Sequence, residues 1–239
     1  MKLGVAIAPA CAGETSFVLL REELSLGCKH AAEAGFNGVE IAVNRPEEIG
    51  VPGVRRLLQQ YGIELPVLST GRVFAEDNLW FTHPNKTLAE QAVQRVKDII
   101  DIASEFRSDV NIGRVRGFVD EEEGRNVAER RFLSAMQECA DYAAAKNINL
   151  LLEPVAREYT NFINSIQDGL EAIERIGADN VLLMPDTFHM NREDPPMTET
   201  LRNAYPKIGY IHFNNTDRQV PGEGEVDFEP IIECLRQLG

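Results

Sequence analysis

The chain has 239 residues, of which 44% are hydrophobic and 26% are charged, as in an ordinary soluble globular protein. That length can bury a large core, either in one α/β barrel or in two small domains. The net charge of −14 disfavours nucleic acid and anionic membrane surfaces as partners, because both require a basic protein surface.

The cysteines and the N-terminus indicate where the chain resides. The four cysteines form no CxxC pair and show no tight spacing. Free thiols in a reducing cytosol are the simplest interpretation, so we predict a cytoplasmic protein. The apolar residues 3–8 are too few for a signal peptide, and no stretch approaches the length of a membrane span.

Apolar periodicity predicts that strands and helices alternate along the chain. Strands are expected at residues 3–8, 36–42, 63–69, 109–113, 150–152, 180–183 and 208–211. Helices are expected at residues 24–33, 53–61, 88–106, 126–146, 166–176, 197–204 and 227–238. Pro66 suggests an edge or a bulge in the third strand. Residues 70–85 are expected to be a long loop, and such length often accompanies function.

This alternation implies an α/β fold with a parallel sheet. No GxGxxG or GxxxxGK[ST] segment follows the first strand, so we favour a (β/α)8 TIM barrel over an open nucleotide-binding sheet. A barrel needs an eighth strand, which is missing from the given sequence. We therefore expect a single barrel domain over residues 1–239 whose C-terminal end is incomplete, with the missing strand beyond Gly239.

Polar side chains follow three of the predicted strands. Residues 150–152 are followed by Glu153, residues 180–183 by Asp186 and residues 208–211 by His212. Because parallel strands end at one rim of a barrel, these side chains are expected to form a divalent-metal site. Two carboxylates and one imidazole suit Mn²⁺, Mg²⁺ or Co²⁺ better than a thiolate or all-histidine zinc site. A buried salt bridge and a hydrogen-bonded core histidine are the alternatives.

Other polar residues near these strand ends are weaker candidates. His189 lies beyond its strand and is expected to contact substrate rather than the ion. Arg218 is a loop cation that either grips a substrate oxygen or lies on the surface. Arg114 and Arg116 follow the fourth strand, and a solvated pair is the preferred interpretation over an anion site.

The second half of the chain carries several short motifs. They are Leu152-Glu153-Pro154, Thr160-Asn161-Phe162, Asp186-Thr187-Phe188-His189-Met190-Asn191, Tyr210-Ile211-His212-Phe213 and Pro221-Gly222-Glu223-Gly224. Together these motifs resemble the xylose isomerase-like TIM barrels, and in particular the sugar phosphate isomerases and epimerases typified by D-tagatose and D-psicose 3-epimerases. The resemblance covers most of residues 148–239, with weaker support from residues 35–40.

The resemblance implies a metal held by Glu153, Asp186 and His212, with Mn²⁺ preferred, and a sugar or polyol contacted by His189 and Arg218. It also implies that Glu153 is catalytic. A bound metal polarises the substrate carbonyl, one Glu removes the neighbouring proton to form an enediolate, and a second Glu returns a proton. We therefore expect a metal-dependent isomerase or epimerase of a ketose or related polyol.

Two departures from the family pattern matter. The second Glu and fourth ligand of the family lie on strand eight, which this sequence does not reach. The epimerases also place a substrate-binding Glu six residues after the metal-binding Glu, where this chain has Tyr159. The substrate therefore need not be tagatose or psicose.

Three alternatives remain open from the sequence. An inosose-dehydratase-like lyase would use the same metal site, and a sugar-binding protein without turnover would follow if the strand-eight Glu were truly absent. An apurinic-site endonuclease is disfavoured, because its metal cluster needs several histidines and this acidic chain has four in all. Many relatives form dimers or tetramers, so a homo-oligomer is compatible with the resemblance, although no interface is legible.

Overall fold

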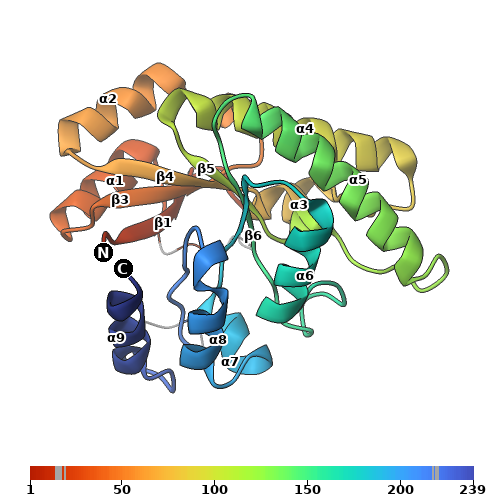
Figure 1. Ribbon diagram of the computed structural model, residues 1–239. Coiled ribbons are helices and arrows are strands. Elements are labelled where there is room, and N and C mark those ends of the chain that lie inside the picture. Colours follow the sequence, from red (N-terminus) through yellow and green to blue (C-terminus); the bar gives the residue numbers. More distant parts are fainter. Residues whose placement is uncertain (14–17, 19, 217, 219–220) are drawn as a thin grey trace. The chain divides into compact units, whose positions relative to one another are not determined.

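The computed structural model of the protein describes residues 1–13, 18, 20–216, 218 and 221–239 (Figure 1). The chain divides into two compact units, Met1–Leu150 and Leu151–Gly239. Within the described ranges, no helix combines the length and the apolar character needed to cross a membrane.

The first unit alternates strands and helices, as the periodicity predicts. Its strands are β1 (Gly4–Ala8), β2 (Leu20–Arg21), β3 (Gly38–Ala42), β4 (Glu64–Ser69) and β5 (Asp109–Ile112), and β6 (Leu150–Leu152) begins at its last residue. Its α-helices are α1 (Leu24–Glu33), α2 (Val51–Tyr61), α3 (Gly71–Asp77), α4 (Lys86–Phe106) and α5 (Arg125–Ala144). Two short 3₁₀ turns, η1 (Pro46–Glu48) and η2 (Arg114–Arg116), follow β3 and β5.

These strands form a parallel sheet in the order β2-β1-β3-β4-β5, and Figure 1 shows β1, β3, β4 and β5 side by side. The register between β3 and β4 shifts because Gly38 pairs with Glu64 whereas Glu40 pairs with Val67. The extra residue on β4 fits a bulge, which is one of the two features that Pro66 suggests, and β4 is not an edge strand. The predicted parallel α/β arrangement is thus confirmed.

The longest helix, α4, shows how the sequence builds this unit. Its buried face carries Val96, Ile99, Ile100 and Ala103, all of them fully buried, at the three- and four-residue spacing of an amphipathic helix. The Asn85 side chain accepts hydrogen bonds from the first free amides and thereby fixes where the helix begins.

The second unit also alternates strands and helices. It contains the rest of β6, then β7 (Val181–Leu183), and the helices α6 (Ile166–Ile176), α7 (Thr187–Glu193), α8 (Met197–Ala204) and α9 (Phe228–Leu238), with the 3₁₀ turn η3 (Tyr205–Lys207) after α8. Helix α8 packs against α6, α7 and α9. The core of this unit includes fully buried Leu151, Leu152 and Leu183.

The seventh predicted strand, residues 208–211, is less regular than expected. It lies parallel to β7 through two isolated bridges, which join Leu183 to Ile208 and Asp186 to His212. The Met184 amide in turn donates to the Leu152 carbonyl at 2.9 Å. The chain segments that end at the three predicted ligands are therefore neighbours in parallel orientation.

Two of the observed helices are not among those that the sequence predicts. Helix α3 lies within residues 70–85, and α7 begins directly after Asp186. Both helices have seven residues, about two turns, which is too short for an apolar repeat to be visible in the sequence.

Candidate metal centre

Glu153, Asp186 and His212 come together in the second unit. Glu153 follows β6, Asp186 follows β7, and His212 ends the segment that pairs with β7. One ligand atom from each of the three lies within 4.8 Å of the other two. The parallel pairing explains this convergence, since it places three consecutive segment ends at the same edge.

Asp186 is held in place by its own surroundings. Its Oδ1 accepts the Phe188 amide at 2.8 Å and so caps the start of α7. Its Oδ2 accepts the Asn214 side-chain amide at 2.9 Å. The side chain is 3% exposed, so its orientation is set by these bonds and by packing.

His212 lies close enough to each of the two carboxylates to share a dication with it. His212 Nδ1 lies 3.2 Å from Glu153 Oε1 and 3.8 Å from Asp186 Oδ2. Two atoms that each ligate one ion at about 2.1 Å stand no more than about 4.2 Å apart, and both of these pairs meet that limit. The donor set of two carboxylates and one imidazole suits Mn²⁺ or Mg²⁺.

Electrostatics also favour a cation at this position. Burial raises the pKa of Asp186, and the neighbouring Glu153 charge raises it further, whereas His189, His212 and the Phe188 amide lower it. Two carboxylates gathered in a poorly solvated place are costly unless a positive charge compensates them.

The two predicted substrate-binding residues lie on a shared pair of aromatic rings. The Arg218 guanidinium carbon is 3.9 Å from the Phe188 ring centroid and 5.6 Å from that of Tyr159. His189 lies edge-on to both rings, at 5.7 Å from Tyr159 and 5.0 Å from Phe188. Its Nδ1 accepts the Ala156 amide at 3.2 Å, so a neutral His189 carries its proton on Nε2.

The prediction of a solvated arginine pair after β5 is wrong. Arg116 is fully buried, and its Nη1 donates to the Gly113 carbonyl at 2.8 Å. Arg114 places its guanidinium 4.9 Å from the Phe74 ring centroid. The two side chains differ in environment because residues 114–116 form the 3₁₀ turn η2, in which the chain is not extended.

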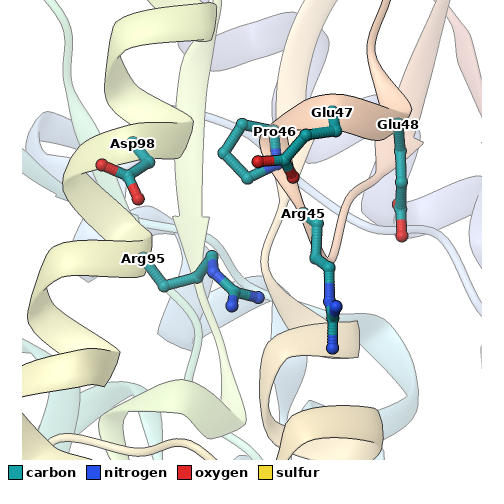
Figure 2. A pocket seen from close by; sticks show the side chains of 6 residues that line it. All are labelled: Arg45, Pro46, Glu47, Glu48, Arg95 and Asp98. Atoms are coloured by element: carbon teal, nitrogen blue, oxygen red, sulfur yellow. The ribbon is translucent and has the colours of Figure 1, made fainter.

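The first unit contains a charged pocket that the sequence does not predict (Figure 2). It has a volume of about 520 Å³, and none of the five predicted site residues lines it. Arg45 and Arg95 both donate to Asp77, at 3.1 and 2.9 Å, so these lining arginines already hold a carboxylate. Its lining residues are Arg45, Pro46, Glu47, Glu48, Arg95 and Asp98.

Beside that pocket, a buried arginine of α3 joins the segments that follow β1, β3 and β4. Arg72, which is 2% exposed, pairs with Glu48 and with Glu76, and Glu76 also accepts the Gly13 amide at 2.9 Å. Apart from the i,i+4 pair of Arg72 and Glu76, the partners are distant in the chain and carry no shared motif, which is why sequence reasoning missed this network.

The sequence is similar to known sugar epimerases. Residues 28–239 match the family described as xylose isomerase-like TIM barrel. The chain is 31% identical over 210 residues to the L-ribulose 3-epimerase of Methylomonas sp. (strain DH-1), covering 87% of this chain and 72% of the relative. It is 28% identical over 225 residues to the L-ribulose 3-epimerase of Mesorhizobium japonicum, covering 92% of this chain and 73% of that enzyme.

Solved structures show the same fold. The D-allulose 3-epimerase of Methylomonas sp. in complex with D-allulose superimposes with a TM-score of 0.79 at 26% identity, covering all of this chain and 81% of that one. The D-psicose 3-epimerase of Clostridium cellulolyticum H10 with D-tagatose gives a TM-score of 0.83 at 22% identity, covering all of this chain and 82% of that one. The predicted barrel fold and the predicted isomerase class are confirmed. The chain belongs to the xylose isomerase-like TIM barrel family.

Proposed function

We propose that this protein is a divalent-metal-dependent ketose 3-epimerase. The observation that carries the proposal is the cluster of Glu153, Asp186 and His212, held at the ends of three parallel segments. The similarity to L-ribulose 3-epimerases supports a ketose as the substrate. The same similarity gives no support to the lyase alternative.

Glu153, Asp186 and His212 would hold the metal, for which Mn²⁺ is the preferred candidate. When bound, such an ion acts as a Lewis acid that polarises the substrate carbonyl and acidifies the neighbouring C–H. Asp186 is already fixed by two hydrogen bonds, so its carboxylate needs little reorganisation on binding.

Glu153 is the base in this scheme. Its carboxylate accepts the proton from the carbon beside the carbonyl, and the electron pair of the C–H bond moves into an enediolate. A proton returned to the opposite face of that carbon inverts it. The family pattern assigns this second step to a Glu on strand eight.

The neighbouring residues orient the sugar. His189 presents Nε2–H because its Nδ1 is engaged by Ala156, and it would donate to a substrate oxygen. Arg218 would hold a further oxygen from above Phe188 and Tyr159. Tyr159 replaces the substrate-binding Glu of the epimerases. The sugar hydroxyls near this position would therefore contact an aromatic ring and not a carboxylate.

The decisive experiment replaces the proposed base. With Mn²⁺ in D₂O, the wild-type protein is expected to incorporate deuterium at C3 of a ketose from a panel of pentuloses and hexuloses. Glu153→Gln keeps the shape but cannot accept the proton, so exchange is expected to fall by at least about 10²-fold. The readout is NMR of the recovered sugar.

Glu171→Gln provides the matched control, because Glu171 is an exposed carboxylate on α6. This variant is expected to exchange at the wild-type rate. Undiminished exchange in Glu153→Gln would remove Glu153 from the mechanism. Absence of exchange by the wild-type protein with every ketose would reject the proposed function.

A further inference from the structure

Arg192, on α7, joins the three segments that follow the proposed metal ligands. Its Nη1 donates to the Phe188 carbonyl at 3.1 Å and its Nη2 to the Thr216 carbonyl at 3.3 Å. Its Nε lies 3.2 Å from Glu158 Oε1. Glu158 follows Glu153 and Thr216 follows His212 in sequence, so one side chain ties all three segments together.

The same arginine packs on the ring that supports Arg218. The guanidinium carbons of Arg192 and Arg218 lie 3.8 and 3.9 Å from the Phe188 centroid. Two guanidiniums this close to one centroid would overlap on a single face, so they occupy opposite faces. Phe188 is 2% exposed and has little room to move, so the place of Arg192 helps to determine the place of Arg218.

Charge balance requires Glu158 in this arrangement. Two like charges on either side of one ring repel each other, and the repulsion is stronger where water is excluded. Glu158 compensates the charge of Arg192 through its contact with Nε. Without that carboxylate, the repulsion would act on Arg218 and on the segment 214–216 that precedes it.

We propose that Arg192, with Glu158, is a positioning residue that holds Arg218 and residues 214–216 in the geometry that binds the substrate. The proposal rests on the proposed epimerase function for its kinetic consequences alone. The competing interpretation is an ordinary surface ion pair of little consequence, since the Arg192 side chain is 30% exposed and the Glu158 side chain 48%.

The first test is kinetic and uses Arg192→Met. Methionine keeps an apolar stem over Phe188 but removes every hydrogen-bond donor. KM for the best ketose is expected to rise about tenfold while kcat falls less than threefold, because substrate binding is disturbed more than proton transfer. Glu158→Gln is expected to raise KM about threefold, and Arg192→Lys to recover part of the loss.

Two controls separate positioning from general damage. Arg202→Met removes an arginine of α8 that donates to Gln237 and is expected to leave KM and kcat unchanged. The Mn²⁺ affinity of Arg192→Met is expected to stay within twofold of wild type, because no metal ligand is altered. A loss of Mn²⁺ affinity in parallel with kcat would overturn the positioning role.

The second test needs no turnover. Amide hydrogen exchange in residues 212–216 is expected to be several-fold faster in Arg192→Met than in wild type, at an unchanged melting temperature. Unchanged exchange would overturn the inference even if KM rose. If the wild-type protein turned over no ketose, the proposed function would fail while this measurement would still decide the role of Arg192.

Discussion

At the scale of single residues, Asp186 combines a structural role with its proposed role as a metal ligand. Each of its oxygens accepts one hydrogen bond, from the Phe188 amide and from the Asn214 side chain. A carboxylate oxygen has two lone pairs, so acceptor capacity remains for a metal ion. The same bonds that cap α7 thus aim the carboxylate at Glu153 and His212.

A second, partly buried carboxyl group in this unit makes a pH-dependent contribution to stability. The pKa of Asp194 is raised from 3.8 to about 6, chiefly by burial and also by the charges of Glu193 and Asp168, while the Ile166 amide opposes the shift. A raised pKa means that the folded state binds the proton more tightly. The contribution of Asp194 is therefore most favourable below pH 4 and is lost as pH rises through 6.

Asp194→Asn is expected to abolish this dependence. Asparagine can still accept the Ile166 amide but does not titrate. The stability of the variant relative to wild type should improve by about 1 kcal/mol between pH 4 and pH 7, allowing for solvent screening of a partly exposed group. Urea unfolding at a series of pH values measures this difference. Asp179→Asn, at an exposed position, is the control, and a pH-independent difference for Asp194→Asn would contradict the assignment.

Single residues differ in how far the sequence reveals them. Glu153 and His212 were predictable as neighbours because each directly follows an apolar run that reads as a strand. Arg116 was misjudged, since nothing in Arg114-Val115-Arg116 indicates which arginine is buried. Arg192 was not singled out, because its role depends on contacts with segments distant in sequence.

At the scale of elements, α6 shows how a helix positions the segment that carries Glu153. Its start is fixed by a capping box between Ser165 and Asp168, and its end by Gly177 in the left-handed conformation. Gly169 lies at the point of closest approach, where an added Cβ would stand 2.7 Å from Leu183 and 3.0 Å from Pro154. Pro154 directly follows Glu153, so this contact bears on the site.

Gly169→Ala is expected to destabilise the protein by about 1 kcal/mol. Alanine gains about 1 kcal/mol of helix propensity, but overpacking against the rigid Pro154 ring costs about 1–3 kcal/mol. Chemical denaturation measures the net change in the free energy of unfolding. Gln167→Ala, at an exposed position of the same helix, is expected to be neutral or slightly stabilising. Greater stability of Gly169→Ala would show that α6 moves away at little cost.

The bounds of a helix were predictable where a long apolar repeat is flanked by capping residues. Helix α6 matches its predicted bounds because it combines an amphipathic repeat with a capping residue and a terminal glycine. Helix α7 was missed since Asp186 was interpreted as a ligand and not also as an N-cap. The strand before His212 was predicted in the right place. The segment makes only isolated bridges with β7, and the sequence does not show how completely two strands will pair.

At the scale of the whole molecule, the net acidic charge and the proposed metal site both favour the binding of a dication. A chain with a net charge of −14 attracts dications and is destabilised by its own repulsion. The cluster of Glu153 and Asp186 concentrates part of that charge in a poorly solvated place. A cation that binds there relieves local repulsion only in the folded state, since the three ligands lie far apart along the unfolded chain.

Binding and stability are therefore linked. At a free Mn²⁺ concentration of about 100 times Kd, the folded state is expected to gain about 2.7 kcal/mol, which raises Tm by roughly 5–10 °C for a chain of this size. EDTA should reverse the shift.

His212→Ala removes one of the three proposed metal donors. This variant should lose most of the Mn²⁺-dependent rise in Tm and most of the bound metal, as measured by calorimetry and elemental analysis. His30→Ala, which alters a histidine paired with Glu22, should retain both. A full Mn²⁺-dependent shift in His212→Ala would place the ion elsewhere in the protein.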